Sequence, residues 1–266
     1  MQHFFTAWEN IGGRIREARR ILIVFDFDGT LTPIMDTPEI VELSEDMREL
    51  LRNLSKHRAY TVAIVSGRSL NDIQNKVGIP GIIYAGNHGL EIAGPNMSFV
   101  HPIAEEIRPV LRIMGLILKK TLGKIKGAAV EDKGITLTIH YRLAGENELE
   151  RIRNAVTNTV GLAEELGKVK TTNGKKVLEV KPDVPWDKGK AVQYIMKRQA
   201  RGGRESGVLP IYMGDDLTDE DAFKFVENYG GITVYVGEEN NRSIASYYLR
   251  STKEVEDSIR RLLSLN

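Results

Sequence analysis

Short, uninterrupted apolar runs recur along the chain, and they constrain its fold more than any other feature of the sequence. Five stand out: ILIVF at 21–25, TVAIV at 61–65, IIYAG at 82–86, VLPIYM at 208–213 and ITVYV at 232–236. Runs this short and this rich in β-branched residues are typical of strands buried on both faces. Helical patterns lie between several of them, and this alternation predicts an α/β fold with a parallel, doubly wound sheet.

The clearest helical pattern is SEDMRELLRNLSKH at 44–57. Its apolar residues form one stripe at helical spacing: Met47, Leu50, Leu51 and Leu54. Ser44 stands immediately before the stripe, where a serine side chain can cap a helix. We therefore expect a helix that begins just after Ser44.

The stretch 104–181 differs from the rest of the chain, because two helix-like segments there alternate with two hairpin-like segments. Asn-Gly at 173–174 favours a type I′ turn between two strands, and Lys-Gly at 133–134 is a weaker turn signal. We predict a core formed by 1–103 and 182–266, with a smaller α+β unit inserted at 104–181.

Composition narrows the classes of partner and of chemistry. Lys and Arg number 37 against 36 Asp and Glu, a net charge of +1, so nothing favours nucleic acid or an anionic membrane as a partner. The absence of cysteine excludes disulfides, thiolate zinc sites and a cysteine nucleophile. The first twenty residues are typical of an amphipathic helix instead of a signal peptide, and no apolar run is long enough to span a membrane. We expect a cytoplasmic protein that acts on a small molecule.

Two carboxylates, Asp26 and Asp28, directly follow the first apolar run. Ligands of open α/β sheets bind beyond the carboxyl ends of the strands, where these side chains are expected. One carboxylate could attack a phosphorus atom while the other moves protons. An ordinary Asp-rich turn closed by Gly29 explains the segment equally well when it is taken alone.

Two further features follow the same logic. Ser66 and Arg68 directly follow the run at 61–65, where a hydroxyl and backbone N–H groups can hold phosphate oxygens. A helix cap formed by Ser66 or Ser69 is the alternative. Lys188 begins a predicted helix, where its ammonium would add to a positive helix end, although most lysines are simply solvated.

Acidic residues cluster after the run at 208–213: Asp215, Asp216, Asp219, Glu220 and Asp221. So many carboxylates are difficult to place together without a cation, and magnesium suits a site of oxygen ligands. Nothing in the sequence favours zinc over magnesium. The acidic start of a helix is the alternative, and it accounts well for Glu220 and Asp221.

Four segments, DFDGTLTPI, SGRSL, the KGKAV lysine and GDDLTDEDAF, resemble in this order the four motifs of the haloacid dehalogenase superfamily. Within it, the chain resembles most the trehalose-6-phosphate phosphatase family. That likeness also rests on AGNHGLE at 85–91, ITLTIHYR at 135–142, GKKVLEVKP at 174–182 and the closing SYYLRSTKEVEDSIRRLL.

The resemblance implies a Rossmann-like core with an α/β cap at 104–181 that determines substrate specificity. It implies that Asp26 is the nucleophile, that Asp28 is the general acid, and that Ser66 and Lys188 grip the phosphate. The reaction implied is hydrolysis of trehalose 6-phosphate to trehalose and phosphate through an aspartyl phosphate.

The resemblance also implies a magnesium site. Its ligands would be the Asp26 carboxylate, the Asp28 backbone carbonyl and Asp215. Asp216 and Asp219 would lie behind these ligands, with Asp219 orienting the waters of the ion.

For the sugar, the resemblance points to six residues: Arg68, His88, Lys133, Arg142, Lys175 and Glu179. In a strand, Lys175 and Glu179 fall on one face and could meet sugar hydroxyls together, but a solvated ion pair across strands fits their spacing equally well. His88 could instead be a simple turn residue.

Other functions share the same motifs. A sucrose-phosphate or mannosyl-phosphoglycerate phosphatase, or a phosphomannomutase-like enzyme, would have the same core residues. A non-catalytic sugar-phosphate sensor is a further alternative, because a fold does not dictate a function. The complete set of catalytic residues favours an enzyme, and a functional link to a trehalose-6-phosphate synthase is expected.

Overall fold

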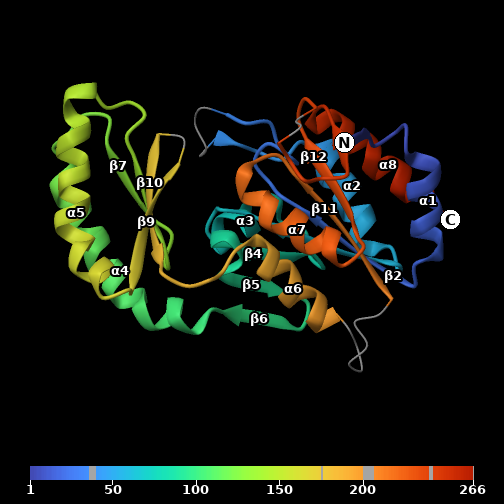
Figure 1. Cartoon of the computed structure of the whole chain (residues 1–266), viewed down its shortest axis with the longest axis horizontal. Coiled ribbons are helices and arrows are strands. Elements are labelled where there is room, and N and C mark those ends of the chain that lie inside the picture. The colour runs from blue at the N-terminus through green and yellow to red at the C-terminus, as the bar shows by residue number, and fades with distance from the viewer. Residues whose placement is uncertain (36–39, 175, 200–206, 240–241, 266) are drawn as a thin grey trace. The chain divides into compact units, whose positions relative to one another are not determined.

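A computed structural model describes residues 1–35, 40–174, 176–199, 207–239 and 242–265. Its internal contacts divide the chain into two compact units. The core unit consists of Met1–Phe99 and Trp186–Asn266, and the inserted unit is Val100–Pro185. The inserted unit thus extends slightly beyond the segment 104–181 on both sides, and Figure 1 shows the elements of each.

The described residues of the core unit form a nine-stranded sheet with the order β1-β13-β12-β11-β2-β3-β4-β5-β6. The strands are β1 (Gln2–His3), β2 (Arg20–Phe25), β3 (Tyr60–Val65), β4 (Ile83–Gly86), β5 (Glu91–Gly94), β6 (Met97–Val100), β11 (Val208–Gly214), β12 (Ile232–Val236) and β13 (Tyr247–Leu249). Every pairing from β1 to β4 is parallel, which confirms the predicted sheet. β5 pairs antiparallel with β4, because a tight turn at 87–89 reverses the chain.

Helices cover both faces of this sheet. They are α1 (Trp8–Glu17), α2 (Glu45–Lys56), α3 (Leu70–Val77), α6 (Lys188–Gln199), α7 (Glu220–Asn228) and α8 (Thr252–Leu263). The side chains of β2 alternate between two layers. Ile23 and Phe25 belong to the buried cluster that includes residues of α1, α2, α3 and α8, whereas Leu22 and Val24 belong to the cluster that includes residues of α6 and α7. The continuous apolar run at 21–25 is therefore explained by burial on both faces.

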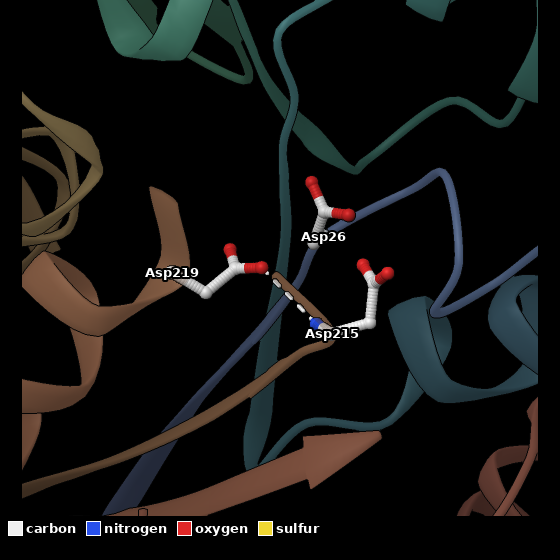
Figure 2. Close-up of side chains that lie close together, drawn as sticks. All are labelled: Asp26, Asp215 and Asp219. Carbon is white, nitrogen blue, oxygen red and sulfur yellow. Dashed lines mark hydrogen bonds between the residues drawn. The ribbon is translucent and has the colours of Figure 1, made fainter. Parts of the chain in front are cut away.

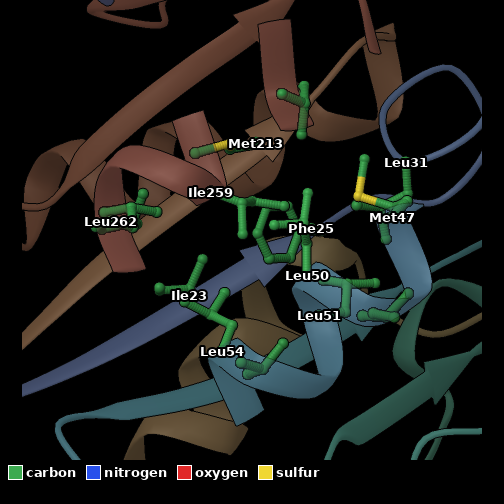
Figure 3. Packing of buried hydrophobic residues seen from close by; sticks show 14 of the residues in the cluster. Ile23, Phe25, Leu31, Met47, Leu50, Leu51, Leu54, Met213, Ile259 and Leu262 are labelled. Atoms are coloured by element: carbon green, nitrogen blue, oxygen red, sulfur yellow. The ribbon is translucent and has the colours of Figure 1, made fainter. Parts of the chain in front are cut away.

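Figure 3 shows the first of these layers, where Ile23 and Phe25 meet the apolar stripe of α2 and residues of α8. The predicted cap of α2 is confirmed, because the Ser44 hydroxyl accepts a hydrogen bond from the backbone N–H of Met47 at 3.2 Å. The predicted stripe is confirmed as well, since all four of its apolar residues are buried.

The inserted unit has a four-stranded antiparallel sheet in its described part, in the order β7-β8-β10-β9. Its elements are α4 (Pro102–Leu122), β7 (Ala129–Asp132), β8 (Leu137–His140), α5 (Leu149–Glu165), β9 (Val169–Gly174) and β10 (Val177–Pro182). Apolar residues of both helices and of the sheet form one buried cluster. This unit therefore has a hydrophobic core of its own.

Both predicted hairpins are present, but the second one turns later than its Asn-Gly pair predicts. Gly174 pairs with Val177 across the β9–β10 ladder, and Lys176, just before Val177, has a φ of 67°. In this register the ladder runs from the pair Val169 and Pro182 to the pair Gly174 and Val177. The longer ladder outweighs the local turn preference of Asn173-Gly174.

None of the helices built from the described residues combines the length and the apolar content that a membrane crossing requires.

We expect Leu54→Ala to lower the free energy of unfolding of the core unit by about 2–5 kcal/mol, because it leaves a cavity under α2. The neighbouring exposed substitution Asn53→Ala should change it by less than about 0.5 kcal/mol. Both tryptophans, Trp8 and Trp186, belong to the core unit, so urea unfolding followed by tryptophan fluorescence reports on this unit. A loss below about 1 kcal/mol for Leu54→Ala would contradict the described packing.

Candidate active site

The predicted catalytic residues lie where parallel strands of the core sheet end. Asp26 follows β2, Ser66 follows β3 and Asp215 follows β11, and these three strands are neighbours in the sheet. The backbone N–H of Asp26 donates to the carbonyl of Met213 at 2.8 Å, which fixes the end of β2 to β11. Strand ends that are distant in sequence thus form one edge, as expected for a parallel sheet.

Lys188 joins two buried carboxylates. Its Nζ donates to Asp26 Oδ1 and to Asp219 Oδ1, each at 2.8 Å. All three side chains are almost entirely buried, so the ions are held in a region of low dielectric. Lys188 is therefore buried, and the alternative of a solvated lysine does not apply.

Burial and neighbouring charges shift the pKa values of Asp26 and Lys188. Burial, together with the nearby Asp219 and Asp215, raises the pKa of Asp26 well above its ordinary value, although Lys188 opposes the change. Burial also disfavours the charged form of Lys188, but Asp219 and Asp26 outweigh it and raise the pKa of the ammonium. Lys188 therefore stays positively charged.

Asp219 has a hydrogen-bond donor on every side. Oδ1 accepts from Lys188 and, at 2.6 Å, from the hydroxyl of Tyr212, while Oδ2 accepts the backbone N–H groups of Asp215 and Asp216, each at 3.1 Å. Gly214 makes this approach possible, because a Cβ there would lie 2.3 Å from Asp219 Cγ. Asp219 therefore fixes the backbone that carries Asp215.

Tyr212 belongs to this hydrogen-bonded cluster, although the sequence did not point to it. It is fully buried in β11, and burial and the neighbouring Asp219 raise the pKa of its hydroxyl well above the ordinary value, so it remains a donor. A signal was available, because a tyrosine in a buried strand usually needs a hydrogen-bond partner.

Carboxylate oxygens of Asp26, Asp215 and Asp219 lie within 4.8 Å of one another, and Figure 2 shows these three side chains converging. Because the oxygens of Asp219 already accept four hydrogen bonds, Asp26 and Asp215 are better placed to bind a cation. Gly29 leaves room for Asp215, since a Cβ at Gly29 would lie 2.1 Å from Asp215 Oδ2. Such a set of oxygen donors fits magnesium.

Asp216 faces a different set of partners. Its Oδ1 accepts from the backbone N–H and the hydroxyl of Thr218, at 2.8 and 2.7 Å, so it caps the short helix Leu217–Asp219. Although burial opposes the change, Lys188, Thr218 and His88 together hold its pKa below the ordinary value. Asp216 is thus a charged capping residue at the edge of the cluster.

Ser66 and Ser69 have separate roles in the loop after β3. Ser69 caps α3 by accepting from the backbone N–H of Asp72 at 3.2 Å. The Ser66 hydroxyl is buried and accepts from the backbone N–H of Arg68, also at 3.2 Å. The capping alternative therefore applies to Ser69, and the phosphate-binding role of Ser66 stays a prediction.

Arg68, expected to contact a sugar, is held by two acidic side chains. Its Nε and Nη2 donate to the two carboxylate oxygens of Asp28 at 2.7 and 2.6 Å, and Nη1 donates to Asp72 at 2.9 Å. No role was predicted for Asp72 from the sequence. Arg68 and Asp72 stand four apart across the start of α3, a spacing at which helical side chains meet, so a signal existed.

His88 lies against the same loop. Its backbone N–H donates to the carbonyl of Ser66 at 2.9 Å, and its φ of 56° places it in a turn. A Cβ at Gly67 would lie 2.9 Å from the His88 ring, so that glycine makes room for it. His88 is thus a turn residue and also a neighbour of the predicted phosphate loop.

The predicted sugar-binding residues of the inserted unit lie at different places on its sheet. Glu179 is in β10, beside Thr138 of β8, on the face opposite to the buried Leu178. Lys133 lies in the β7–β8 turn, whereas Arg142 follows the other end of β8. Lys175 lies outside the described residues. The sugar-binding roles of all four stay predictions.

Known proteins resemble the chain over most of its length. The family model for trehalose-phosphatase matches residues 24–253. Trehalose 6-phosphate phosphatase RA3 of Zea mays is 36% identical over 260 residues, covering 92% of this chain and 70% of that protein. A trehalose-phosphate phosphatase of Mycobacterium leprae is 36% identical over 254 residues, covering 92% of this chain and 58% of that protein.

Solved structures resemble the fold. The C-terminal domain of the C. albicans trehalose-6-phosphate phosphatase has a TM-score of 0.78 at 24% identity, covering 97% of both chains. A haloacid dehalogenase-like hydrolase from Bacteroides thetaiotaomicron has a TM-score of 0.62 at 17% identity, covering 91% of this chain and 99% of that one. These likenesses confirm the predicted haloacid dehalogenase fold.

If Asp26 and Asp215 bind a divalent cation, Asp215→Asn should weaken magnesium binding at least about tenfold, because it removes a charged oxygen ligand. Isothermal titration calorimetry with magnesium alone measures this without any turnover. Asp183→Asn, in the inserted unit, is the control and should bind as the unchanged protein does. Equal magnesium affinity in Asp215→Asn and the control would contradict this assignment.

Proposed function

The chain belongs to the trehalose-phosphatase family and is a phosphoric monoester hydrolase, and from this premise we propose that it hydrolyses trehalose 6-phosphate to trehalose and phosphate. The observation that carries the proposal is the buried Lys188, which joins Asp26 to Asp219 at the ends of β2 and β11. A buried ion pair is often no more stabilising than apolar side chains of the same size, so a buried lysine of this kind favours a functional role.

Asp26 is the nucleophile in this proposal. One of its oxygens forms a bond to phosphorus as the bond from phosphorus to the sugar oxygen breaks, which gives an aspartyl phosphate. Lys188 offsets the repulsion between the carboxylate and the phosphate, because its ammonium already touches Asp26. Ser66, at the end of the neighbouring strand β3, would donate a hydrogen bond from its hydroxyl to a phosphate oxygen.

Asp28 moves the protons. It donates one to the departing sugar oxygen, and its carboxylate then takes one from the water that attacks the aspartyl phosphate. Its side chain is 40% exposed whereas Asp26 is nearly buried, so the two carboxylates have environments that suit different roles. The two steps together return Asp26 and Asp28 to their starting states.

The proposal includes magnesium as cofactor, held by the Asp26 carboxylate, the Asp28 backbone carbonyl and Asp215. When bound, the ion would neutralise negative charge on the phosphate and on the carboxylates. The acidic cluster supports this, because Lys188 supplies one positive charge to three neighbouring carboxylates. Asp219 would keep the backbone of Asp215 and Asp216 in place behind the ion, because its Oδ2 accepts both of their N–H groups.

We further propose that the inserted unit is a cap that determines substrate specificity. His88 on the core unit, and Lys133, Arg142, Lys175 and Glu179 on the inserted unit, would contact the sugar. Basic and acidic side chains together can hydrogen-bond sugar hydroxyls as donors and acceptors. A cytoplasmic location and a functional link to a trehalose-6-phosphate synthase stay predictions.

Asp26→Asn should abolish phosphate release from trehalose 6-phosphate, with kcat falling by about a thousandfold or more, because an amide cannot form the acyl phosphate. Phosphate release with magnesium present measures this. Asp46→Asn, at the exposed start of α2, is the matched control and should keep full activity. Full activity in Asp26→Asn would refute the proposed mechanism.

Among sugar phosphates, trehalose 6-phosphate should have the highest kcat/KM, by at least about tenfold over sucrose 6-phosphate and mannosyl-phosphoglycerate. Glu179→Gln should reduce this preference while leaving hydrolysis of an aryl phosphate unchanged, since the aryl group has no sugar hydroxyls. A higher kcat/KM for another sugar phosphate would replace the proposed substrate. Binding without turnover at any magnesium concentration would instead favour the sensor function.

A further inference from the structure

We propose that Arg68, held in turn by Asp72, is a positioning residue that fixes the carboxylate of Asp28 for proton transfer, and that neither residue serves as a sugar contact. The inference rests on the proposed function, in which Asp28 protonates the departing oxygen. It assigns Asp72 a role, and it changes the role expected for Arg68.

The geometry between Arg68 and Asp28 is that of a fork closed on a carboxylate. Nε and Nη2 reach one oxygen each, at 2.7 and 2.6 Å. Two parallel hydrogen bonds from a charged donor fix the orientation of the carboxyl group as well as its position, and each oxygen keeps a second lone pair that can carry the proton. A lysine cannot do the same, because its ammonium is a single point of charge.

Arg68 is itself held rigidly. Its side chain is only 10% exposed, and its guanidinium lies 5.4 Å from the centroid of the Phe27 ring. Its backbone N–H donates to Ser66, and its carbonyl accepts from Asn87 at 2.7 Å. The guanidinium thus extends from the loop after β3 to Asp28 in the loop after β2.

Asp72 completes this arrangement from the first turn of α3. Its carboxylate accepts from Arg68 Nη1 at 2.9 Å, on the side of the guanidinium away from the Asp28 fork. A carboxylate in the first turn of a helix is also favoured by the helix dipole, which suits Asp72 to this position. Asp72 therefore limits the rotation of Arg68 without touching Asp28.

Asp28 needs such support, because an exposed aspartate otherwise populates several rotamers. A general acid must lie within hydrogen-bond reach of the oxygen that it protonates, and small displacements reduce the rate steeply. Asp28 is 40% exposed, in contrast to the buried Asp26. The Arg68 fork supplies the order that burial supplies for the nucleophile.

The leaving group of the substrate distinguishes this role from the alternatives. A sugar or simple alkyl oxygen leaves poorly and needs a proton from Asp28 as its bond to phosphorus breaks. The oxygen of p-nitrophenyl phosphate leaves readily without one. A sugar contact would matter for trehalose 6-phosphate alone, whereas a structural role would matter for all substrates.

The test compares trehalose 6-phosphate, ethyl phosphate and p-nitrophenyl phosphate as substrates of Asp72→Asn and Arg68→Lys. The quantity is kcat/KM, which reports on the first phosphoryl transfer and excludes the later attack by water. Asp46→Asn, also an aspartate in the first turn of a core-unit helix, is the matched control. Tryptophan fluorescence during urea unfolding monitors the fold of each variant.

We expect Asp72→Asn to lower kcat/KM about tenfold for both alkyl substrates and less than about twofold for p-nitrophenyl phosphate, with a larger effect in Arg68→Lys. A loss restricted to trehalose 6-phosphate would overturn the proposal in favour of a sugar contact. An equal loss for all three substrates, or no loss for any, would also overturn it. If the unchanged protein hydrolyses none of them, the proposed function itself fails.

Discussion

The buried ammonium of Lys188 is the interaction on which the candidate site depends. It lies 2.8 Å from both Asp26 and Asp219, and it joins the end of β2 to the segment that follows β11. A buried charge without partners would be too costly to keep, and a pair of buried acids without a cation would be equally costly. Each of the three groups therefore makes the burial of the other two possible.

Around this interaction, further hydrogen bonds join the acidic side chains of the site to backbone and side-chain donors. Asp219 links Lys188 and Tyr212 to the backbone of Asp215 and Asp216, while Arg68 links Asp28 to Asp72. Networks of this kind hold reacting groups in place before a substrate binds. The proposed nucleophile and the proposed acid are thus ordered by two separate sets of contacts.

Much of this architecture could be predicted from local pattern. Apolar runs located the central strands, Ser44 marked the start of α2, and motif order placed Asp26, Ser66 and Asp215 at neighbouring strand ends.

Local pattern could not predict which side chains pair with one another. The carboxylates of Asp28 and Asp219 each had several possible donors in the sequence, and only the tertiary structure selects Arg68 for one and Tyr212 for the other. The β9–β10 turn was misplaced for a related reason, because the extent of a ladder outweighs the preference of two residues.

The insertion between the two parts of the core has a consequence for the order of events during synthesis. Asp26 and Lys188 are 162 residues apart, and β2 has no partner on its β11 side until residues 208–214 have emerged from the ribosome. The inserted unit, whose sheet and helices come from one continuous segment, is complete before then. Since domains generally fold as units during synthesis, the nascent chain carries a folded insertion together with an unfinished sheet and an incomplete candidate site. Hydrolytic competence therefore begins only when the last third of the chain has been made.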